Sequence, residues 1–439
     1  MINANAKFRQ TTFRGVLRAT MSVAAVVAVT SSAIAGGFAI REQSVSSQGA
    51  SFAGSAAGGD LSSIFWNPAA TGVKNGLNTE SHTAIILPRA NIEVDSATNV
   101  VPAVQAAFDA SGTKSGDIGN VALVGASYGN YQLSRDLWLG FGLNSPFGLT
   151  TKPGVSDYKG AVLGRSARLL TINANPTIAY QIMPGVLIGA GFQAQWADAE
   201  LKFATGIPQA ASTFFEGDDW AFGGTAGILF QPSDSTSIGI GYRSRLSHTI
   251  EGTFGTVGTA LQVGGEADLD LPDIVTLSVS HAVTPAIRLL GTVEWSNWSQ
   301  FEDLTVISTE AGATALTGPI GGGAQIATIP ANWDDGWFFS LGAEYDVSST
   351  ITVRSGVAYE ISPVDEPEKR IISIPDSDRI WLSFGATMKV TESMELDLAF
   401  THIWLEDERF VRESVATTAP GLPPQTSITG STEARTNII

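Results

Sequence analysis

The chain has 439 residues, 47 of them glycine and none cysteine, and 15% of its residues are charged against 44% that are hydrophobic. The lack of cysteine excludes disulfide bonds and thiol catalysis, and the formal net charge of −17 argues against nucleic acid as a partner. The charged fraction lies well below the roughly 25% of a soluble domain. Yet no apolar run long enough for a membrane-spanning helix follows residue 35. This combination favours a transmembrane β-barrel, in which only alternate side chains face lipid.

Residues 1–35 have the pattern of an export signal. A region with four basic residues and no acidic residue precedes an apolar and small-residue stretch over 19–32. Ala33-Ile34-Ala35 then forms a small-x-small cleavage signal before Gly36. A retained membrane anchor is the alternative, but the apolar stretch is short for a span of about 20 residues. We therefore expect a signal peptide at 1–35, whose removal takes away four positive charges and changes the net charge from −17 to −21.

Residues 36–76 differ from everything that follows them. The segment is rich in glycine, serine and alanine and lacks apolar periodicity, so it predicts neither a strand nor a long helix. It closes on Ile64-Phe65-Trp66-Asn67-Pro68-Ala69-Ala70, shortly before the first β segment. A compact non-sheet segment at the head of a membrane barrel has one natural place, which is the lumen. We expect residues 36–76 to form a hatch that plugs a barrel made by residues 77–439.

Alternating β segments occupy most of the chain beyond the hatch. One parity is apolar and the other is glycine, polar or charged, as over 394–401, where Met, Leu, Leu and Phe alternate with Glu, Asp, Ala and Thr. A soluble sandwich shows the same alternation, but its strands usually have about 5–6 residues, and these approach a tilted bilayer span. The predicted strands are 83–93, 121–132, 137–144, 165–182, 185–203, 219–230, 236–250, 267–282, 286–300, 334–346, 350–360, 378–389 and 394–407.

The connections between these segments alternate in length. Short turns at one end and long loops at the other are typical of an outer-membrane barrel, and six short and seven long connections imply an all-β antiparallel barrel of 14 strands. Residues 433–439 look like the start of the fourteenth strand, so we interpret the chain as lacking its last few residues, with an unusual natural end as the alternative. The short connections are 134–136, 183–185, 231–235, 284–285, 346–349 and 391–393; the long ones are 95–118, 146–164, 204–218, 251–266, 301–333, 361–377 and 408–431.

With leader, hatch and strand count in place, the chain resembles the FadL family of outer-membrane transporters for long-chain fatty acids and other hydrophobic compounds. The resemblance rests on 36–44 (GGFAIREQS) and on Asn67-Pro68-Ala69, with further matches at 144–149 (NSPFGL), 175–180 (NPTIAY) and 241–244 (GYRS). It covers essentially all of the mature chain. The departure is at the C-terminus, where the family has a closing strand that ends in an aromatic residue.

The resemblance implies a place in the outer membrane of a Gram-negative bacterium, assembly there by the barrel assembly machinery, and contact with membrane lipid and lipopolysaccharide. It also implies a route for a lipophile. Extracellular loops capture it, a pocket in the lumen receives it, and it leaves sideways into the membrane after the hatch moves, through a gap at a kinked third strand. We expect a monomer, because one barrel closes its own sheet.

Five residues are candidates for the moving parts of this route. Asn67, Pro68 and Ala69 are the expected latch of the hatch, although Asn-Pro also favours an ordinary turn. Pro146 and Gly148 end the third strand, where a kink or a loop start is expected. The hypothesis is that these two residues form the lateral gate.

Candidates for contact with the cargo lie on the loops and in the lumen. Arg243 and Arg245 share the inward parity of the seventh strand and could bind the carboxylate of a fatty acid. The alternative is that they pair with lumenal acids such as Glu294 or Glu344. Apolar residues on the third and fourth long loops either capture the lipophile or pack the loops together: Ile207, Phe214, Phe215, Phe254, Val257 and Leu261.

Other function classes fit the sequence less well. An outer-membrane enzyme would need a nucleophile or metal motif, and the four histidines stand in none, so we expect no catalysis, no metal and no cofactor. An open diffusion porin would not need a long segment in its lumen. Within the transporter class, aromatic hydrocarbons or other neutral lipophiles are the alternative cargo to long-chain fatty acids.

Overall fold

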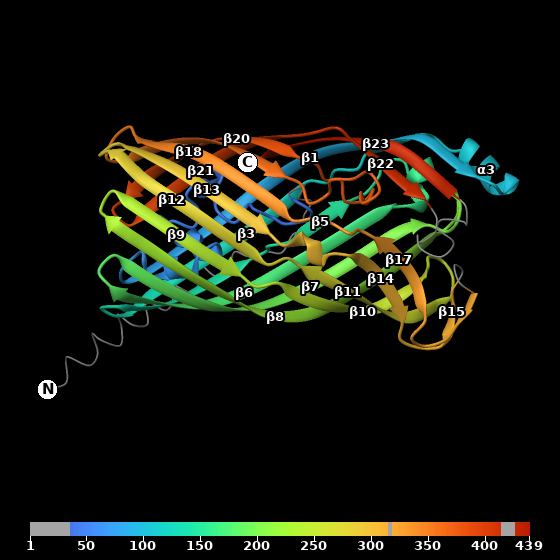
Figure 1. Cartoon of the computed structure of the whole chain (residues 1–439), viewed down its shortest axis with the longest axis horizontal. Helices are drawn as coiled ribbons and strands as arrows, with labels where there is room; N and C mark the ends of the chain where they lie inside the picture. The colour runs from blue at the N-terminus through green and yellow to red at the C-terminus, as the bar shows by residue number, and fades with distance from the viewer. Residues whose placement is uncertain (1–35, 315–317, 414–425) are drawn as a thin grey trace.

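One closed sheet makes up most of the molecule (Figure 1). The structure is a computed structural model that describes residues 36–314, 318–413 and 426–439. The expected signal peptide at 1–35 lies outside the described residues. No helix among the residues described is long and apolar enough to cross a membrane.

The sheet is built from segments that are mostly long and antiparallel. They are β1 (Leu77–Asn99), β2 (Lys114–Asp117), β3 (Ala122–Ser134), β4 (Leu137–Asn144), β5 (Gly148–Thr151), β6 (Ser166–Met183), β7 (Val186–Ala204), β8 (Ser212–Ser233), β9 (Thr236–Arg243), β10 (Leu246–Thr256), β11 (Gln262–Leu271), β12 (Ile274–Thr284), β13 (Ile287–Ser296), β14 (Asp303–Ser308), β17 (Gln325–Pro330), β18 (Gly336–Asp346), β19 (Ile351–Ile361), β20 (Arg379–Thr391), β21 (Met394–Leu405), β22 (Glu408–Glu413) and β23 (Thr426–Ile438). A separate hairpin pairs β15 (Gly312–Thr314) with β16 (Gly318–Ile320).

The helices and 3-10 turns among the described residues are all short. Two α-helical segments, α2 (Val45–Gln48) and α3 (Pro102–Asp109), lie before and after β1 in the chain. The 3-10 turns are η1 (Leu61–Phe65), η2 (Pro68–Gly72), η3 (Lys159–Val162) and η4 (Trp298–Gln300).

The described segments close into a barrel of 14 antiparallel strands, as the sequence predicts. Several barrel strands are interrupted, so the third consists of β4 and β5, and the seventh of β9 and β10. Closure comes from β23, which pairs with β1 from Ile86↔Ile438 to Asn99↔Thr426 and with β21 and β22 on its other side. This last strand begins at Thr426, inside the predicted long loop 408–431, rather than at residue 433.

Apolar side chains cover the outside of the barrel. In β21 and β18, Leu398 and Leu341 are 66% and 70% exposed, whereas Thr401 and Ser340 on the other parity are buried. The alternation follows from the two-residue period of a strand. A sheet that is apolar outside and polar inside suits hydrocarbon around it and polar groups within.

The two ends of the barrel differ, as predicted. Five of the six short connections lie within one residue of the predicted positions, for example between β3 and β4 and between β20 and β21, and the sixth, predicted at 231–235, is shortened to 234–235 because β8 continues to Ser233. Two of the predicted long loops are corrected, because 204–218 and 251–266 are mostly strand: β7 and β8 are joined by residues 205–211, and β10 and β11 by residues 257–261. The opposite end carries α3 and the β15–β16 hairpin (Figure 1).

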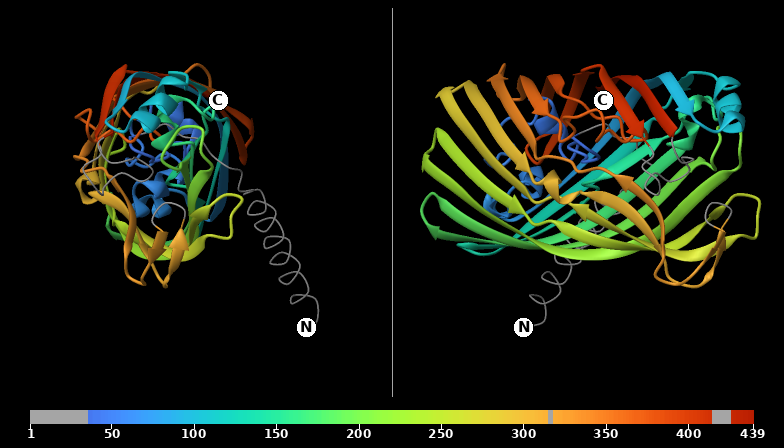
Figure 2. Two further views of the ribbon diagram at one scale, coloured as in Figure 1. Left: turned by 90° about the vertical axis from the view of Figure 1, so that its right-hand side faces the viewer. Right: turned by 45° about the vertical axis from the view of Figure 1, so that its right-hand side comes forward.

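The head segment, residues 36–76, contributes no strand to the barrel sheet and lies inside the ring of strands (Figure 2, blue). It consists of α2, η1 and η2 joined by turns. Most of its residues are buried, including Trp66 and Phe52. The lumen therefore holds the segment whose sequence shows no β alternation.

Candidate functional site: the barrel lumen and the break in its third strand

The head segment follows the inner wall and bonds to one barrel strand after another. It lacks long elements of its own, so its backbone groups need partners from the wall. Hydroxyl and amide side chains supply them. Ser340 Oγ donates to Ser51 O (2.6 Å), Thr292 Oγ1 to Phe52 O (3.0 Å) and Asn130 Nδ2 to Thr71 O (2.8 Å), while Ser278 Oγ accepts from Ala56 N (3.0 Å).

Glycines of the wall let the head segment approach the sheet backbone directly. A Cβ built on Gly239 would overlap the carbonyl oxygen of Ala56, and one on Gly241 would overlap that of Trp66. Strand glycines commonly mark such close approach of another backbone. The backbone of the head segment at Ala56 and Trp66 therefore lies in van der Waals contact with the backbone of β9.

Asn67-Pro68-Ala69 begins η2 and joins it to the wall. Asn67 Oδ1 accepts from Ala69 N (3.0 Å), which caps the turn, and its Nδ2 donates to Ala56 O (2.9 Å) and to Ile228 O of β8 (3.0 Å). Pro68 stands at the first helical position, where its fixed φ fits and no N–H is needed. Ala69 is fully buried against Trp138, Leu187 and Leu229.

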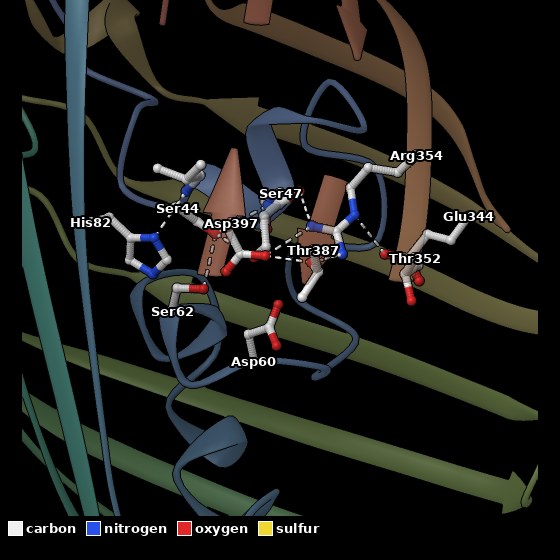
Figure 3. A network of polar contacts seen from close by, with 12 residues as sticks. Ser44, Ser47, Asp60, Ser62, His82, Glu344, Thr352, Arg354, Thr387 and Asp397 are labelled. Carbon is white, nitrogen blue, oxygen red and sulfur yellow. Dashed lines mark hydrogen bonds and ion pairs between the residues drawn. The ribbon is translucent and has the colours of Figure 1, made fainter. Parts of the chain in front are cut away.

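An arginine of β19 ties α2 to the wall on one side (Figure 3). Arg354 donates to Ser46 O (3.3 Å) and also contacts Glu344 (3.2 Å), Asp397 (3.5 Å) and Thr387 (2.6 Å). Its charge is balanced by the carboxylates of Glu344 and Asp397. Its hydrogen bond to Ser46 O joins α2 to the wall.

A histidine of β1 (Figure 3) and a glutamate of the same strand hold the other side of the head segment. His82 Nε2 lies 2.6 Å from Glu80, so the other ring nitrogen, Nδ1, accepts from Val45 N (3.1 Å). Glu80 also accepts from the backbone N–H groups of Leu61 (2.8 Å) and Ser62 (3.3 Å) at the start of η1. Two acceptors of one strand thereby satisfy the beginnings of α2 and η1.

The part of the head segment around Asp60 faces the end of the barrel with the short turns, and its surroundings are polar. Two cavities of about 560 and 750 Å³ lie there, and both are lined by Asp60. Charged wall residues line the rest, among them Arg288, Glu344, Lys389 and Glu395. Water, not lipid, suits such walls.

The third barrel strand breaks at Ser145–Phe147, close to the predicted gate residues Pro146 and Gly148. Below the break, β4 pairs with β3 as far as Ser127↔Leu143. Beyond it, the described pairings join β5 to β6 but not to β3. A window in the ladder therefore opens between β3 and β5.

The beginning of the head segment pairs with the edge of this break. Ile40 N donates to Pro146 O (2.8 Å), Gly148 N donates to Phe38 O (2.9 Å), and Ala39 and Phe147 form an antiparallel bridge. Residues 38–40, here called the N-terminal strand, thus occupy a position that a neighbouring barrel strand would otherwise fill.

Five aromatic rings meet next to the break, and we call them the aromatic cluster: Phe38, Phe147, Trp298, Phe301 and Trp333. The ring of Phe38 lies at the centre, 4.7 Å from Trp298, 5.8 Å from Phe301, 5.9 Å from Trp333 and 6.3 Å from Phe147. All five are at most 4% exposed and belong to a larger apolar cluster of the lumen that includes Phe203, Phe215 and Phe254. Most of the rings meet edge to face, which is the favoured geometry of aromatic pairs.

Buried charges surround the start of the head segment. Arg41 contacts Glu294 (2.6 Å) and Glu360 (3.3 Å) and lies over the ring of Phe338. Its neighbour Glu42 is 3% exposed, and burial raises the pKa of this carboxyl to about 7. The apolar cluster therefore borders a region of buried charged side chains.

The two arginines predicted for the lumen lie in different places. Arg243 is buried and faces inward, but it donates to Phe65 O (3.0 Å) and Gln193 Oε1 (2.5 Å) and lies over the ring of Phe65, so it holds the head segment. Arg245 is exposed, donates to Gln300, and follows the outward parity of Ser247 and Thr249, so its predicted lumenal position is wrong. The cause is the break at 244–245 between β9 and β10, which shifts the alternation by one residue.

The residues predicted to capture cargo on loops are divided between strands and turns. Phe215 of β8 and Phe254 of β10 form a cross-strand pair inside the apolar cluster. Phe214, also in β8, is 8% exposed. Outside the strands, Ile207 is half-buried in the turn between β7 and β8, and Val257 and Leu261 are exposed in the turn between β10 and β11. The structure thus brings together two of the six.

Sequence reasoning missed most of the aromatic cluster. Trp298 and Phe301 lie at the end of the predicted ninth strand and at the start of the next loop, and Trp333 lies at the end of that loop. Phe38 stands within the GGFAIREQS stretch that carried the family resemblance. A glycine pair followed by an aromatic residue, just after the predicted signal peptide, was the available signal; the partners of the ring became visible only in the closed barrel.

The chain shows no arrangement for metal chemistry in the residues described. No group of three or more His, Asp or Glu side chains there could hold a metal ion. His248 contacts Asp219 (3.1 Å) and Gln195 (3.1 Å), and His402 contacts Asn437 (2.7 Å), so both histidines sit in local hydrogen bonds of the wall.

Comparisons with known proteins agree with this architecture. A family model described as outer membrane protein transport protein (OMPP1/FadL/TodX) matches residues 26–439. The chain is 27% identical over 314 residues to the long-chain fatty acid transport protein of Escherichia coli O6:H1, covering 62% of this chain and 67% of that one. A Pseudomonas aeruginosa FadL homologue superposes with a TM-score of 0.78 at 18% identity, covering 92% and 98% of the two chains. The Pseudomonas putida toluene transporter TodX does so with a TM-score of 0.61 at 16% identity, covering 92% and 99%.

Proposed function

Because the chain belongs to the OMPP1/FadL/TodX family of outer-membrane transport proteins for hydrophobic compounds, we propose that it carries long-chain fatty acids or similar lipophiles and releases them sideways through the break in the third barrel strand. The observation that carries the proposal is a shared pair of residues. Phe38 and Phe147 belong both to the aromatic cluster and to the backbone contacts that line the break. Withdrawal of the N-terminal strand would therefore vacate an apolar site and uncover the break in one movement.

The polarity of the lumen supports lateral release. On the far side of the head-segment core, the cavities are lined by charged side chains such as Arg288 and Glu344. A lipophile that left the apolar cluster in that direction would lose its burial, which is worth roughly 25 cal/mol per Å² of apolar surface. Through the break, the same molecule would reach the apolar outer face of the barrel, and hence membrane lipid.

The movement is confined to the start of the head segment. Residues from about 50 to 72 are held by wall hydroxyls, by Asn67 and by the contact with Gly239 and Gly241. The N-terminal strand, in contrast, has two backbone hydrogen bonds to the break and one aromatic ring, that of Phe38, which a bound lipophile can replace. The capture of cargo by Val257 and Leu261 at the exposed turn is part of the same proposal.

A disulfide lock tests the route, since the chain has no cysteine of its own. Ala39 and Phe147 form a pair flanked by two hydrogen bonds, a geometry with Cα atoms about 4.5 Å apart, which a disulfide can span. The double variant Ala39→Cys/Phe147→Cys should lose uptake of a labelled long-chain fatty acid in cells when oxidised. Reduction should restore uptake to the level of the two single variants.

A second cysteine pair controls for oxidation itself. Leu277 and Val293 face each other on the outer surface of β12 and β13, where no movement is proposed. Oxidised Leu277→Cys/Val293→Cys protein should transport as well as its reduced form. Undiminished fatty-acid uptake by the oxidised Ala39→Cys/Phe147→Cys variant would contradict the lateral route.

Neutral aromatic hydrocarbons are the second candidate cargo, and the aromatic cluster favours them. Two buried arginines of the lumen have partners in the protein: Arg41 is paired with Glu294 and Glu360, and Arg243 with Phe65 O and Gln193. The matched probes are a long-chain fatty acid, its methyl ester and toluene, tested for displacement of a fluorescent lipophile. Weaker binding of the acid to Arg243→Ala, with unchanged ester binding, would support a carboxylate site; equal affinities throughout would favour the neutral cargo.

A further inference from the structure

The backbone nitrogen of Gly36 lies in a buried acidic site. It is 3.2 Å from Glu360 Oε1, and the next amide, that of Gly37, donates to Asp376 Oδ2 (3.0 Å). The side chains of Glu360 and Asp376 are 4% and 0% exposed. Two consecutive backbone nitrogens are therefore directed at two buried carboxylates.

The site has room for backbone only. A Cβ on Gly36 would lie 2.6 Å from Glu360 Oε1. Gly37 has a φ of 65°, and a Cβ there would lie 2.8 Å from Trp333 and 2.9 Å from Trp298. The pair Gly36-Gly37 thus seats a main chain against the carboxylates while keeping the rings of the aromatic cluster in place.

The charges joined by direct contact at this site do not balance. Three carboxylates contact two guanidinium groups: Glu294 and Glu360 contact Arg41, and Glu360 and Asp376 contact Arg379. Nearby Arg370 donates to Asp376 O, but its charge is paired with Glu408 (3.1 Å). An unmatched buried carboxylate is costly. The cluster lacks one cation.

We propose that hydrolysis of the Ala35–Gly36 bond creates this cation, and that the resulting α-ammonium group of Gly36 forms an ion pair with Glu360. The hydrolysis, by a signal peptidase, consumes one water. The carboxylate stays on Ala35 with the leader, and the amine freed on Gly36 takes up a proton. The uncleaved chain offers only a neutral amide N–H at this position.

The ion pair would act on the position of the N-terminal strand. Gly36 precedes Phe38 by two residues, so fixing its nitrogen on Glu360 places the Phe38 ring in the aromatic cluster and residues 38–40 along the break. The ammonium group and Arg41 also share Glu360, which joins the start of the chain to the rest of the ion network. The inference concerns processing and anchoring, and it stands or falls independently of the cargo.

The test measures one amine. The mature protein is purified from outer membranes, its N-terminus is identified by mass spectrometry, and the α-amine is reductively methylated with ¹³C-formaldehyde in folded and denatured protein. We expect Gly36 as the first residue and an at least tenfold slower reaction in the folded state. Titration by NMR should give the amine a pKa above the ordinary value of about 8, because a carboxylate partner favours the charged form.

Two variants separate the ion pair from burial alone. Glu360→Gln should lower the pKa of the amine and speed its methylation, while Glu344→Gln, which removes a half-buried glutamate that pairs with other arginines, should change neither. Insertion of two serines between Ala35 and Gly36 moves the amine by up to about 7 Å and should make it react as in denatured protein. A different first residue, or equal reactivity in folded and denatured wild-type protein, would overturn the proposal. So would an unchanged amine pKa in a folded Glu360→Gln variant.

Discussion

The head segment contains two adjacent buried charged residues, and only one of them has a partner of opposite charge among the residues described. Arg41 and Glu42 are adjacent and both buried, but only Arg41 has carboxylate partners, in Glu294 and Glu360. Oε2 of Glu42 has no hydrogen-bond partner within the described part of the chain. Ionisation of this carboxyl is therefore opposed by its surroundings, which makes it the clearest pH-sensitive group of the head segment.

Replacing Glu42 by glutamine should stabilise the barrel at high pH only. The folded pKa of about 7 exceeds the ordinary value of 4.5, so the folded state binds more protons than the unfolded state between these values. The free energy of unfolding consequently falls as pH rises through this window. Glu42→Gln should match wild type at pH 4.5 and exceed it at pH 8 by up to about 3 kcal/mol, measured by urea unfolding in lipid vesicles. The exposed Glu395→Gln is the control; a stability difference independent of pH would contradict the prediction.

Short elements succeed here because the wall completes them. The turn η2 has five residues, too few to be stable alone, and it owes its start to Asn67 and its place to β8. The broken third strand is the complementary case, because its edge is completed by the N-terminal strand. In both, an element that is irregular by itself becomes ordered by backbone partners distant in the chain.

Asn67→Ala should destabilise the head segment and expose it to proteolysis. The change removes one acceptor and two donor contacts and leaves Ala56 O, Ile228 O and Ala69 N unpaired by this side chain. Each buried polar group left unsatisfied costs about 1–3 kcal/mol. Asn67→Asp keeps the cap but sets a buried carboxylate against the carbonyl oxygens of Ala56 and Ile228, so its loss should be at least as large. Limited proteolysis and urea midpoints measure the series; an unchanged midpoint for Asn67→Ala would disprove the latch.

At the scale of the whole molecule, the barrel is a closed wall around a filled lumen. The closure joins β1 to β23, more than 300 residues apart in the chain, and each wall strand then offers inward side chains to the head segment. A hatch of this kind has a measurable consequence for ions.

Deletion of residues 36–76, with residues 1–35 kept for export, should convert a poorly conducting protein into a wide pore. The head segment fills the ring of strands (Figure 2), so its removal leaves a polar channel through which hydrated ions pass. Single-channel conductance in planar bilayers should rise severalfold over wild type. A wild-type protein that already conducts like an open porin would refute the plug.

The sequence by itself determined the wall. Alternation with a period of two is a local property, so the strand count, the six short turns and the head segment without alternation were all readable, and the motif stretches led to the family. The same local logic explains the errors. The break at Ser244–Arg245 shifts the alternation in the rest of the seventh strand by one residue, so a strict two-residue period wrongly placed Arg245 in the lumen. In addition, nothing local distinguishes strands that extend into a hairpin from a loop, as at 204–218.

Only the tertiary structure decided what meets in the lumen. Phe38 and Trp298 are about 260 residues apart in the chain, and Gly36 and Glu360 are 324 apart. Such contacts depend on closure and on the path of the head segment, neither of which has a sequence period. Asn67 and the break residues Pro146 and Gly148 also have partners distant in the chain. The closed barrel brings distant strands around one lumen, and the head segment contacts them one after another.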